Sequence, residues 1–150
     1  MNAFLERVVA QKRDEVAAGR RIRPEAELRA RCAGLPPCRD FVAAVTEAPD
    51  RIIAEVKRRS PSHPAFVQHA APAQLAAAYA RGGAAALSIV TDAANFGTSL
   101  DDVAALKQAV PLPVIAKDFV IDPVQIRAAW AAGADAVLLI ARMLDRAGID

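Results

Sequence analysis

Residues 52–62 read IIAEVKRRSPS, a short apolar run that carries an acid and a base two positions apart and ends in a serine-proline turn. Because side chains alternate faces along a strand, Glu55 and Lys57 project to one side, and Ala54 and Val56 project to the other. Two opposite charges on one face of a buried strand are costly unless they pair or bind a ligand. The stretch therefore predicts either a structural ion pair or part of an active site.

The composition indicates one soluble globular domain. With 150 residues, 54% of them hydrophobic, the chain is neither disordered nor collagen-like. The formal charge is +2, and the densest basic cluster, at 20–23, has no interleaved aromatic residues, which argues against nucleic acid as a partner. No stretch approaches the roughly 18 uninterrupted apolar residues of a membrane span.

The cysteines and histidines bear on redox compartment and metal binding. Cys32 and Cys38 follow no signal peptide, so we expect reduced thiols and a cytoplasmic protein. His63 and His69 lack a matching carboxylate or cysteine pattern, so we expect no metal site and regard both as loop residues.

Beyond residue 50 the pattern alternates between short strands and helices, which is typical of parallel βα units. The predicted strands are 52–57, 86–90, 113–117 and 136–140. The predicted helices between them begin at Pro72, after Ser99 and at Asp122-Pro123. Before residue 50 we expect only helices: an amphipathic one with a stripe through 5–16 that includes Lys12, then two shorter ones from Pro24 and near 40–45.

Two architectures fit this alternation, an open doubly wound sheet and a βα barrel. The chain has no Gly-x-Gly-x-x-Gly turn after its first strand, which disfavours the doubly wound sheet. In a βα barrel the active site lies at the carboxyl ends of the strands. Polar residues fall at those ends: Lys57, Thr91, Asp92, Lys117, Asp118 and Arg142. This placement favours an α/β chain of the (βα)8 TIM-barrel class with its site there.

Four motifs, AEVKRRSPS at 54–62, LSIVTD at 87–92, PVIAKDFVIDP at 113–123 and GADAVLLI at 133–140, resemble the indole-3-glycerol phosphate synthase family. Segments 5–13 and 39–41 resemble that family's helical extension before the barrel, so the similarity covers nearly the whole chain. It implies a carbon-carbon lyase of tryptophan biosynthesis. The reaction is ring closure of 1-(2-carboxyphenylamino)-1-deoxyribulose 5-phosphate to indole-3-glycerol phosphate, with loss of carbon dioxide and water and no cofactor.

The resemblance also implies roles for residues. Lys117 corresponds to the general acid that protonates the substrate carbonyl, Glu55 to its acidic partner, and Lys57 to a contact for the substrate's anionic groups. The substrate-binding residues implied are Ser60, Pro61, Phe96 and Phe119, the two phenylalanines lining the anthranilate pocket. Core packing for the phenylalanines, and a turn hydroxyl for Ser60, are the alternative interpretations.

Two positions depart from the family's pattern, and both lie in loops that follow strands. Pro64 stands where the family usually has glycine, and proline fixes φ and removes an N–H donor. Gly97 is displaced by one place after Phe96. We expect loops of different shape at both places.

A complete barrel needs eight strands and about 250 residues, whereas four strands are predicted here. We therefore expect a single domain made of a helical extension at 1–50 and the first half of a barrel at 51–150, apparently truncated. Open edges predict self-association or pairing with a missing half, and little turnover by the isolated chain. Two alternatives remain: a non-catalytic half barrel that assembles with a partner or binds phosphosugars, and another phosphosugar barrel such as the neighbouring isomerase. The combination of Glu55-x-Lys57 with Lys117-Asp118-Phe119 disfavours the isomerase.

Overall fold

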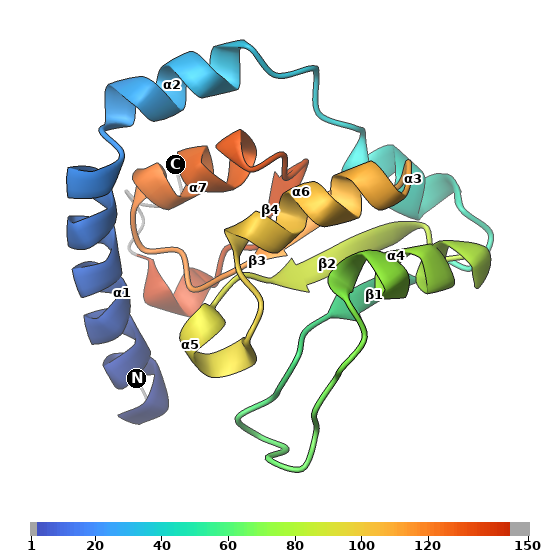
Figure 1. Cartoon of the computed structure of the whole chain (residues 1–150), viewed down its shortest axis with the longest axis horizontal. Coiled ribbons are helices and arrows are strands. Elements are labelled where there is room, and N and C mark those ends of the chain that lie inside the picture. Colours follow the sequence, from blue (N-terminus) through green and yellow to red (C-terminus); the bar gives the residue numbers. More distant parts are fainter. Residues whose placement is uncertain (1–2, 145–150) are drawn as a thin grey trace.

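The computed structural model describes residues 3–144 and contains one parallel sheet with strand order β1-β2-β3-β4 (Figure 1). The strands are β1 Ile53–Val56, β2 Ala86–Val90, β3 Val114–Lys117 and β4 Ala136–Val137. Each strand pairs with the next along the chain, in a register that sets Glu55 beside Ser88 and Val90 beside Lys117. This sequential order is the one expected of consecutive βα units.

Helices precede the sheet and alternate with its strands. Their bounds are α1 Ala3–Ile22, α2 Glu25–Ala33, α3 Phe41–Glu47, α4 Pro72–Arg81, α5 Ala93–Phe96, α6 Leu100–Ala109 and α7 Pro123–Ala131, with a short 3₁₀ helix at Ala141–Met143. The predicted helix starts are confirmed, since Pro72 and Pro123 begin α4 and α7. Ser99 caps α6, and its own N–H donates to Asp102 at 2.9 Å.

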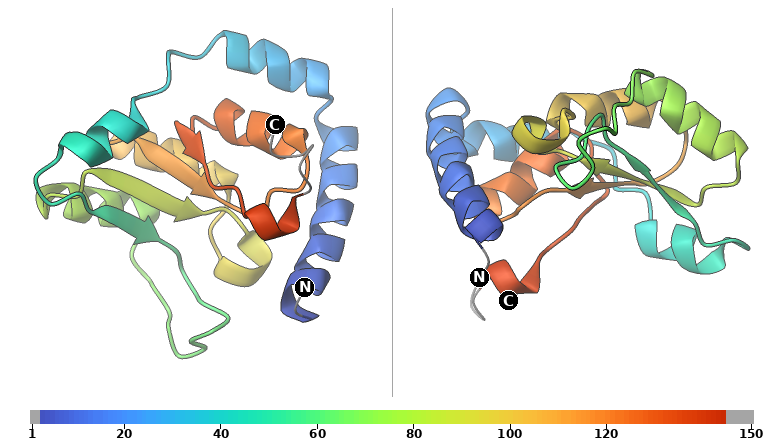
Figure 2. Two further views of the ribbon diagram at one scale, coloured as in Figure 1. Left: turned by 180° about the vertical axis from the view of Figure 1, so that it is seen from behind. Right: turned by 90° about the horizontal axis from the view of Figure 1, so that it is seen from below.

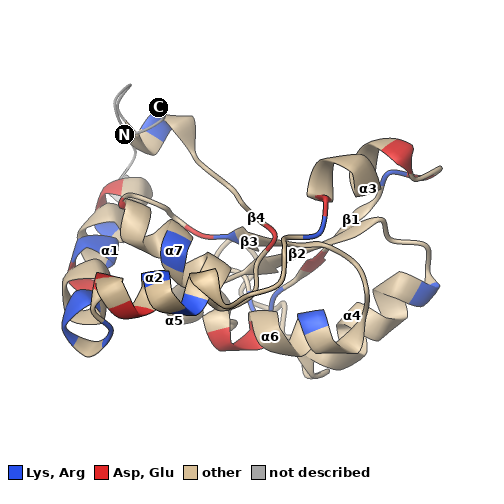
Figure 3. Cartoon of the chain, turned by 90° about the horizontal axis from the view of Figure 1, so that it is seen from above, with Lys and Arg blue, Asp and Glu red and all other residues tan. Residues whose placement is uncertain are grey.

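The helices cover the sheet unequally. Helices α4 and α6 lie on one face, and α3 lies on the opposite face near the amino ends of β1 and β2 (Figures 2 and 3). The buried core forms on the face of the sheet that α4 and α6 cover, between the sheet and these two helices. Its members are Val56, Ala76, Leu87, Ile89, Val103, Leu106, Val110, Val114, Ala116, Ala129 and Ala134. Glu55 and Lys57 alternate with Val56, so they face away from this core.

Strands β1 and β3 match the predicted ranges except for one residue at each end of β1 and one at the start of β3. Two larger corrections are needed. Strand β4 ends at Val137, not at residue 140. The last backbone hydrogen bond between β4 and β3 runs from the Leu138 N–H to the Ala116 carbonyl. Because β3 ends at Lys117, the residues that follow Leu138 have no strand to pair with on that side. Helix α5, between β2 and α6, was not predicted. Its four residues are too few for a periodic pattern, and it is held by its Asp92 cap.

Asp135 ties the amino ends of β3 and β4 to the helical extension. Its carboxylate accepts the Val114 N–H at 2.8 Å, the Arg39 N–H at 2.7 Å and the Lys107 ammonium at 2.6 Å. The Arg39 guanidinium in turn donates to the carbonyls of Val110 and Leu112 at the end of α6. A side chain that is 2% exposed thus satisfies donors from three separate segments.

Two further findings concern the cysteines and the apolar character of the helices. Cys32 and Cys38 are both free thiols, the first buried and the second exposed. Within residues 3–144, no helix combines the length and the apolar character needed to cross a membrane.

Candidate active site

Glu55, Lys57 and Lys117 meet at the carboxyl end of the sheet. The Lys57 ammonium lies 2.8 Å from Glu55 Oε1, and the Lys117 ammonium lies 2.6 Å from Glu55 Oε2. Glu55 is in β1 and Lys117 ends β3, so the pairing spans β2, where only Ser88 and Val90 lie between them on this face. One carboxylate thus bridges two ammonium groups from strands that are not adjacent.

The charge of this cluster suits an anionic ligand. Burial raises the pKa of Glu55. The hydrogen bonds from Lys117 and Lys57, together with the positive charges of these lysines, lower the pKa by more than burial raises it, so it lies below its ordinary value. Glu55 is therefore ionised at neutral pH and neutralises one of the two lysines. The Lys117 side chain is 43% exposed, so its ammonium can reach a bound molecule while it contacts Glu55.

Because the pKa of Glu55 is lowered in the folded protein, this residue makes the free energy of unfolding decrease as the pH falls. Its ionised form stabilises the fold above the ordinary glutamate pKa of about 4.3. This stabilisation is lost as the pH falls through the lower, folded value. We expect the free energy of unfolding, measured by urea titration, to fall less steeply below about pH 5 in Glu55→Gln than in the wild type. Parallel acid limbs in the two proteins would contradict this prediction.

The loop after β1 is long and projects from the sheet (Figure 1). Ser60, 8% exposed, lies 3.0 Å from the hydroxyl of Ser62, whereas Pro61 is exposed. Pro64 occupies the second position of a turn closed by the Phe66 N–H and the His63 carbonyl at 2.8 Å, a position that favours proline and needs no N–H. Proline is therefore compatible with the shape that this loop adopts.

The loop after β2 is fastened to the loop after β1. The Phe96 carbonyl accepts the N–H groups of Arg58 and Arg59, each at 3.1 Å, and the Arg59 guanidinium donates to the carbonyls of Ala93 and Ala94 at 2.9 Å. Gly97, which follows, has φ +76° and ends α5. The displaced glycine thus provides the left-handed residue that turns the chain from α5 towards α6.

Replacing Gly97 with alanine is expected to destabilise the protein. The new Cβ would lie 3.1 Å from Arg58 Cβ at a positive φ, and the left-handed conformation alone costs a residue with a side chain roughly 1–2 kcal/mol. Urea unfolding measures the loss. The matched control is Gly19→Ala inside α1, where a Cβ meets nothing within 4 Å and about 0.5–1 kcal/mol of added stability is expected. Equal effects of the two substitutions would contradict the prediction.

Phe119 contacts an aromatic residue of the extension. Its ring packs edge-on against Phe4 of α1, with centroids 6.1 Å apart. Its carbonyl accepts from the Gln125 side chain at 3.1 Å, and its N–H donates to Asp118 at 2.7 Å. The ring is half-buried, so it can contribute both to packing and to the wall of a pocket.

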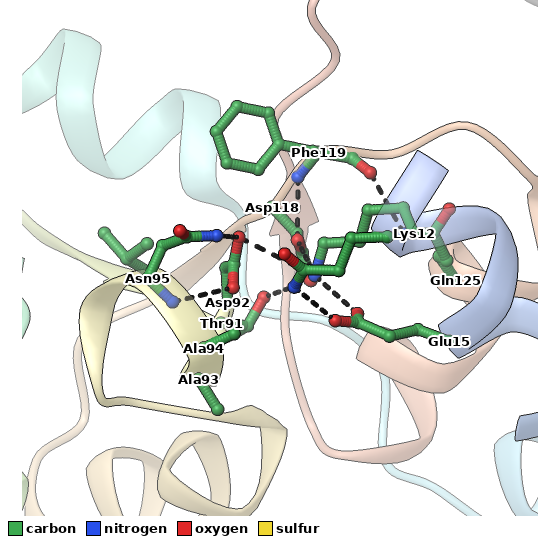
Figure 4. A network of polar contacts seen from close by, with 12 residues as sticks. Lys12, Glu15, Thr91, Asp92, Ala93, Ala94, Asn95, Asp118, Phe119 and Gln125 are labelled. Atoms are coloured by element: carbon green, nitrogen blue, oxygen red, sulfur yellow. Dashed lines mark hydrogen bonds and ion pairs between the residues drawn. The ribbon is translucent and has the colours of Figure 1, made fainter. Parts of the chain in front are cut away.

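A buried polar network lies beside these residues, under α1 (Figure 4). Lys12, 2% exposed, contacts Glu15 at 2.8 Å and Asp118 at 2.9 Å, and its ammonium lies 4.0 Å from Asp92. The sequence analysis did not identify this network. Its signal was a lysine within the apolar stripe of the first helix, combined with aspartates directly after two strands.

The predicted site residues are thus only partly brought together. Glu55, Lys57 and Lys117 contact one another, and Lys57 also lies 5.7 Å from the centre of the Phe66 ring, a neighbour that was not predicted. In the described part of the chain, no hydrogen bond or ion pair links those three residues to Ser60, Pro61, Phe96 or Phe119. Nor does that part contain a group of three or more His, Cys, Asp or Glu side chains that could hold a metal ion.

Comparison with known proteins agrees with the sequence motifs. Residues 5–150 match the family described as indole-3-glycerol phosphate synthase. The chain is 45% identical over 144 residues to indole-3-glycerol phosphate synthase 2 of Streptomyces coelicolor, which covers 96% of this chain and 56% of that protein. It is 45% identical over 150 residues to the Micrococcus luteus enzyme and 42% identical over 149 residues to that of Hyphomonas neptunium, each covering 97% of this chain and 56% of the relative.

The chain therefore spans about half the length of the curated relatives it matches. The predicted fold class, an α/β chain of the TIM-barrel class with four parallel strands, is confirmed by the sheet and by the family match.

Proposed function

The chain belongs to the indole-3-glycerol phosphate synthase family, and from this we propose that it supplies the general acid and part of the substrate site for the ring-closure reaction of that family. The observation that carries the proposal is the contact of Lys117 and Lys57 with the two oxygens of Glu55, at the carboxyl end of a parallel sheet. A substrate that bears a phosphate and a carboxylate needs cations, and this cluster has one positive charge in excess.

The proposed chemistry assigns one task to each of the three residues. Lys117 donates a proton to the carbonyl oxygen of the ribulose moiety as the aromatic carbon attacks the carbonyl carbon. Carbon dioxide leaves the attacking ring carbon, and the electrons of the broken bond restore the aromatic ring. The new hydroxyl group then takes a second proton and leaves as water, while the neighbouring carbon, which is bonded to nitrogen, loses one proton to a base and the double bond of the indole forms. Glu55 orients the Lys117 ammonium through the 2.6 Å contact, and Lys57 binds an anionic group of the substrate.

The substrate-binding roles of Ser60, Pro61, Phe96 and Phe119 are part of the proposal. The support for them is that the loops after β1 and β2 are fastened together through the Phe96 carbonyl, and that Phe119 follows Lys117 by two residues. The proposed acid step needs no metal or organic cofactor. We also propose that the protein is cytoplasmic.

The experiment that tests the function is an assay of the complete gene product. We expect purified protein to convert 1-(2-carboxyphenylamino)-1-deoxyribulose 5-phosphate into indole-3-glycerol phosphate, followed by the appearance of indole absorbance and the release of carbon dioxide. Substrate binding without product would favour the second candidate, a non-catalytic half barrel. Neither binding nor turnover would contradict both.

The open edges of the sheet favour assembly with a further half barrel. In the described range β1 and β4 each pair on one side only, and apolar side chains of these strands or next to them stay exposed, among them Ile52 at 49%, Ile53 at 44% and Leu139 at 40%. We propose that residues 1–150 alone self-associate or pair with such a half, and that they have little turnover by themselves. Sedimentation analysis of residues 1–150 tests this, and a stable active monomer would contradict it.

A further inference from the structure

Lys12 is a buried cation whose partners come from three different segments. Glu15 is one turn further along α1, Asp92 follows β2, and Asp118 follows β3. Burial lowers the pKa of Lys12, but the charge of Asp118, its hydrogen bond, that of Glu15, and the charge of Asp92 together raise it above the ordinary lysine value. The ammonium is therefore charged at neutral pH and links α1 to the carboxyl ends of two strands.

The link to Asp118 controls the segment that carries the general acid. The Asp118 carboxylate accepts from Lys12, from the Thr91 hydroxyl at 3.0 Å and from the Phe119 N–H at 2.7 Å (Figure 4). Lys117 precedes Asp118 directly, and Phe119 follows it. Fixing the Asp118 side chain therefore fixes the backbone from which both neighbours extend.

The Lys12 ammonium lies farther from Asp92, at 4.0 Å, than from Asp118, at 2.9 Å, but Asp92 belongs to the adjacent loop, the one after β2. Asp92 is fully buried and caps α5, accepting the N–H of Asn95 at 3.2 Å and its side-chain amide at 2.8 Å. Helix α5 ends at Phe96. Removing the Lys12 charge would leave the fully buried Asp92 carboxylate and the partly buried Asp118 carboxylate without their shared cation.

We propose that Lys12 is a positioning residue for ring closure: from α1, through Asp118, it holds Lys117 and Phe119 in the arrangement that the acid step requires. The proposal rests on the function proposed above. Under this proposal, helix α1 contributes to catalysis by positioning residues of the site, in addition to covering apolar surface. A displacement of reacting groups by about 1 Å can cost roughly 100-fold in rate, so a loss of this anchor has a measurable effect.

The test compares Lys12→Met with Lys107→Met in the complete gene product. Both substitutions remove a lysine that pairs with an aspartate, 17% exposed in the case of Asp118 and 2% exposed in the case of Asp135, but Lys107 and Asp135 lie at the amino end of the sheet, away from Lys117. We expect Lys12→Met to lower kcat about 10- to 100-fold with a smaller change in KM, and Lys107→Met to leave kcat per folded molecule within about twofold. Amide exchange at Phe119 should accelerate in Lys12→Met alone.

Two results would overturn the positioning role: an unchanged kcat in Lys12→Met, or equal losses of kcat in both variants. An inactive wild type would instead overturn the proposed function itself. Should Lys12→Met fail to fold, Lys12→Gln takes its place, because glutamine removes the charge but keeps a hydrogen-bond donor. The same outcomes then decide.

Discussion

Lys117→Met is expected to lower kcat for ring closure by about 10²- to 10⁴-fold, the usual contribution of a positioned general acid. Methionine keeps the length of the side chain and its apolar stem but has no proton to donate. Because Lys117 is 43% exposed, its replacement leaves no deeply buried group unpaired, and Glu55 keeps Lys57 as a partner at 2.8 Å. The loss should therefore appear in kcat, measured by indole absorbance with the complete gene product, without a matching loss of stability.

The matched control is Lys57→Met, which removes the other ammonium from the same carboxylate. If Lys57 binds an anionic group of the substrate, its loss should raise KM more than it lowers kcat. A Lys117→Met protein that retains kcat within about tenfold of the wild type would refute the general-acid role. Loss of kcat on replacing Lys57 but not Lys117 would exchange the roles of the two lysines.

The strand pattern and the contact of Lys57 and Lys117 with Glu55 could be predicted from sequence spacing and strand order. Glu55 and Lys57 are two residues apart, so any strand at this position places them on one face. Lys117 joins them because the carboxyl ends of parallel strands lie at one edge of the sheet. The contact with Glu55 across β2 required only that the strands follow one another in sequence order.

The role of Lys12 could not be predicted in the same way. Its nearest partner outside α1, Asp118, lies 106 positions further along the chain, and no local pattern states where a helix before the sheet will cross it. Periodicity placed Lys12 on the apolar face of α1, which fixes that the side chain points inward but not what it meets. The end of β4 was missed for a related reason, because the apolar run 136–140 continues beyond the last residue for which β3 offers a partner.

Asp135→Ala is expected to cost about 3–5 kcal/mol of unfolding free energy, the range for breaking a buried ion pair by removing one partner. The substitution would leave the N–H groups of Val114 and Arg39 and the Lys107 ammonium without their shared acceptor, in a place where the carboxylate is 2% exposed. Water cannot readily replace an acceptor at so closed a position. Urea titration measures the change, and an unaltered slope with denaturant would show that the compactness of both states is retained.

The control for Asp135→Ala is Glu25→Ala, which also removes a carboxylate with two basic partners. Glu25 contacts Arg29 at 2.9 Å and Arg127 at 2.8 Å, but the three side chains are between 32% and 66% exposed, so water and salt replace much of the interaction. Its loss should therefore be much the smaller of the two. Comparable losses would mean that the three segments that donate to Asp135, those of Arg39, Lys107 and Val114, are held in place mainly by apolar packing. In that case Lys107→Met would cost little stability, and it would no longer match Lys12→Met as a control for broken buried pairs.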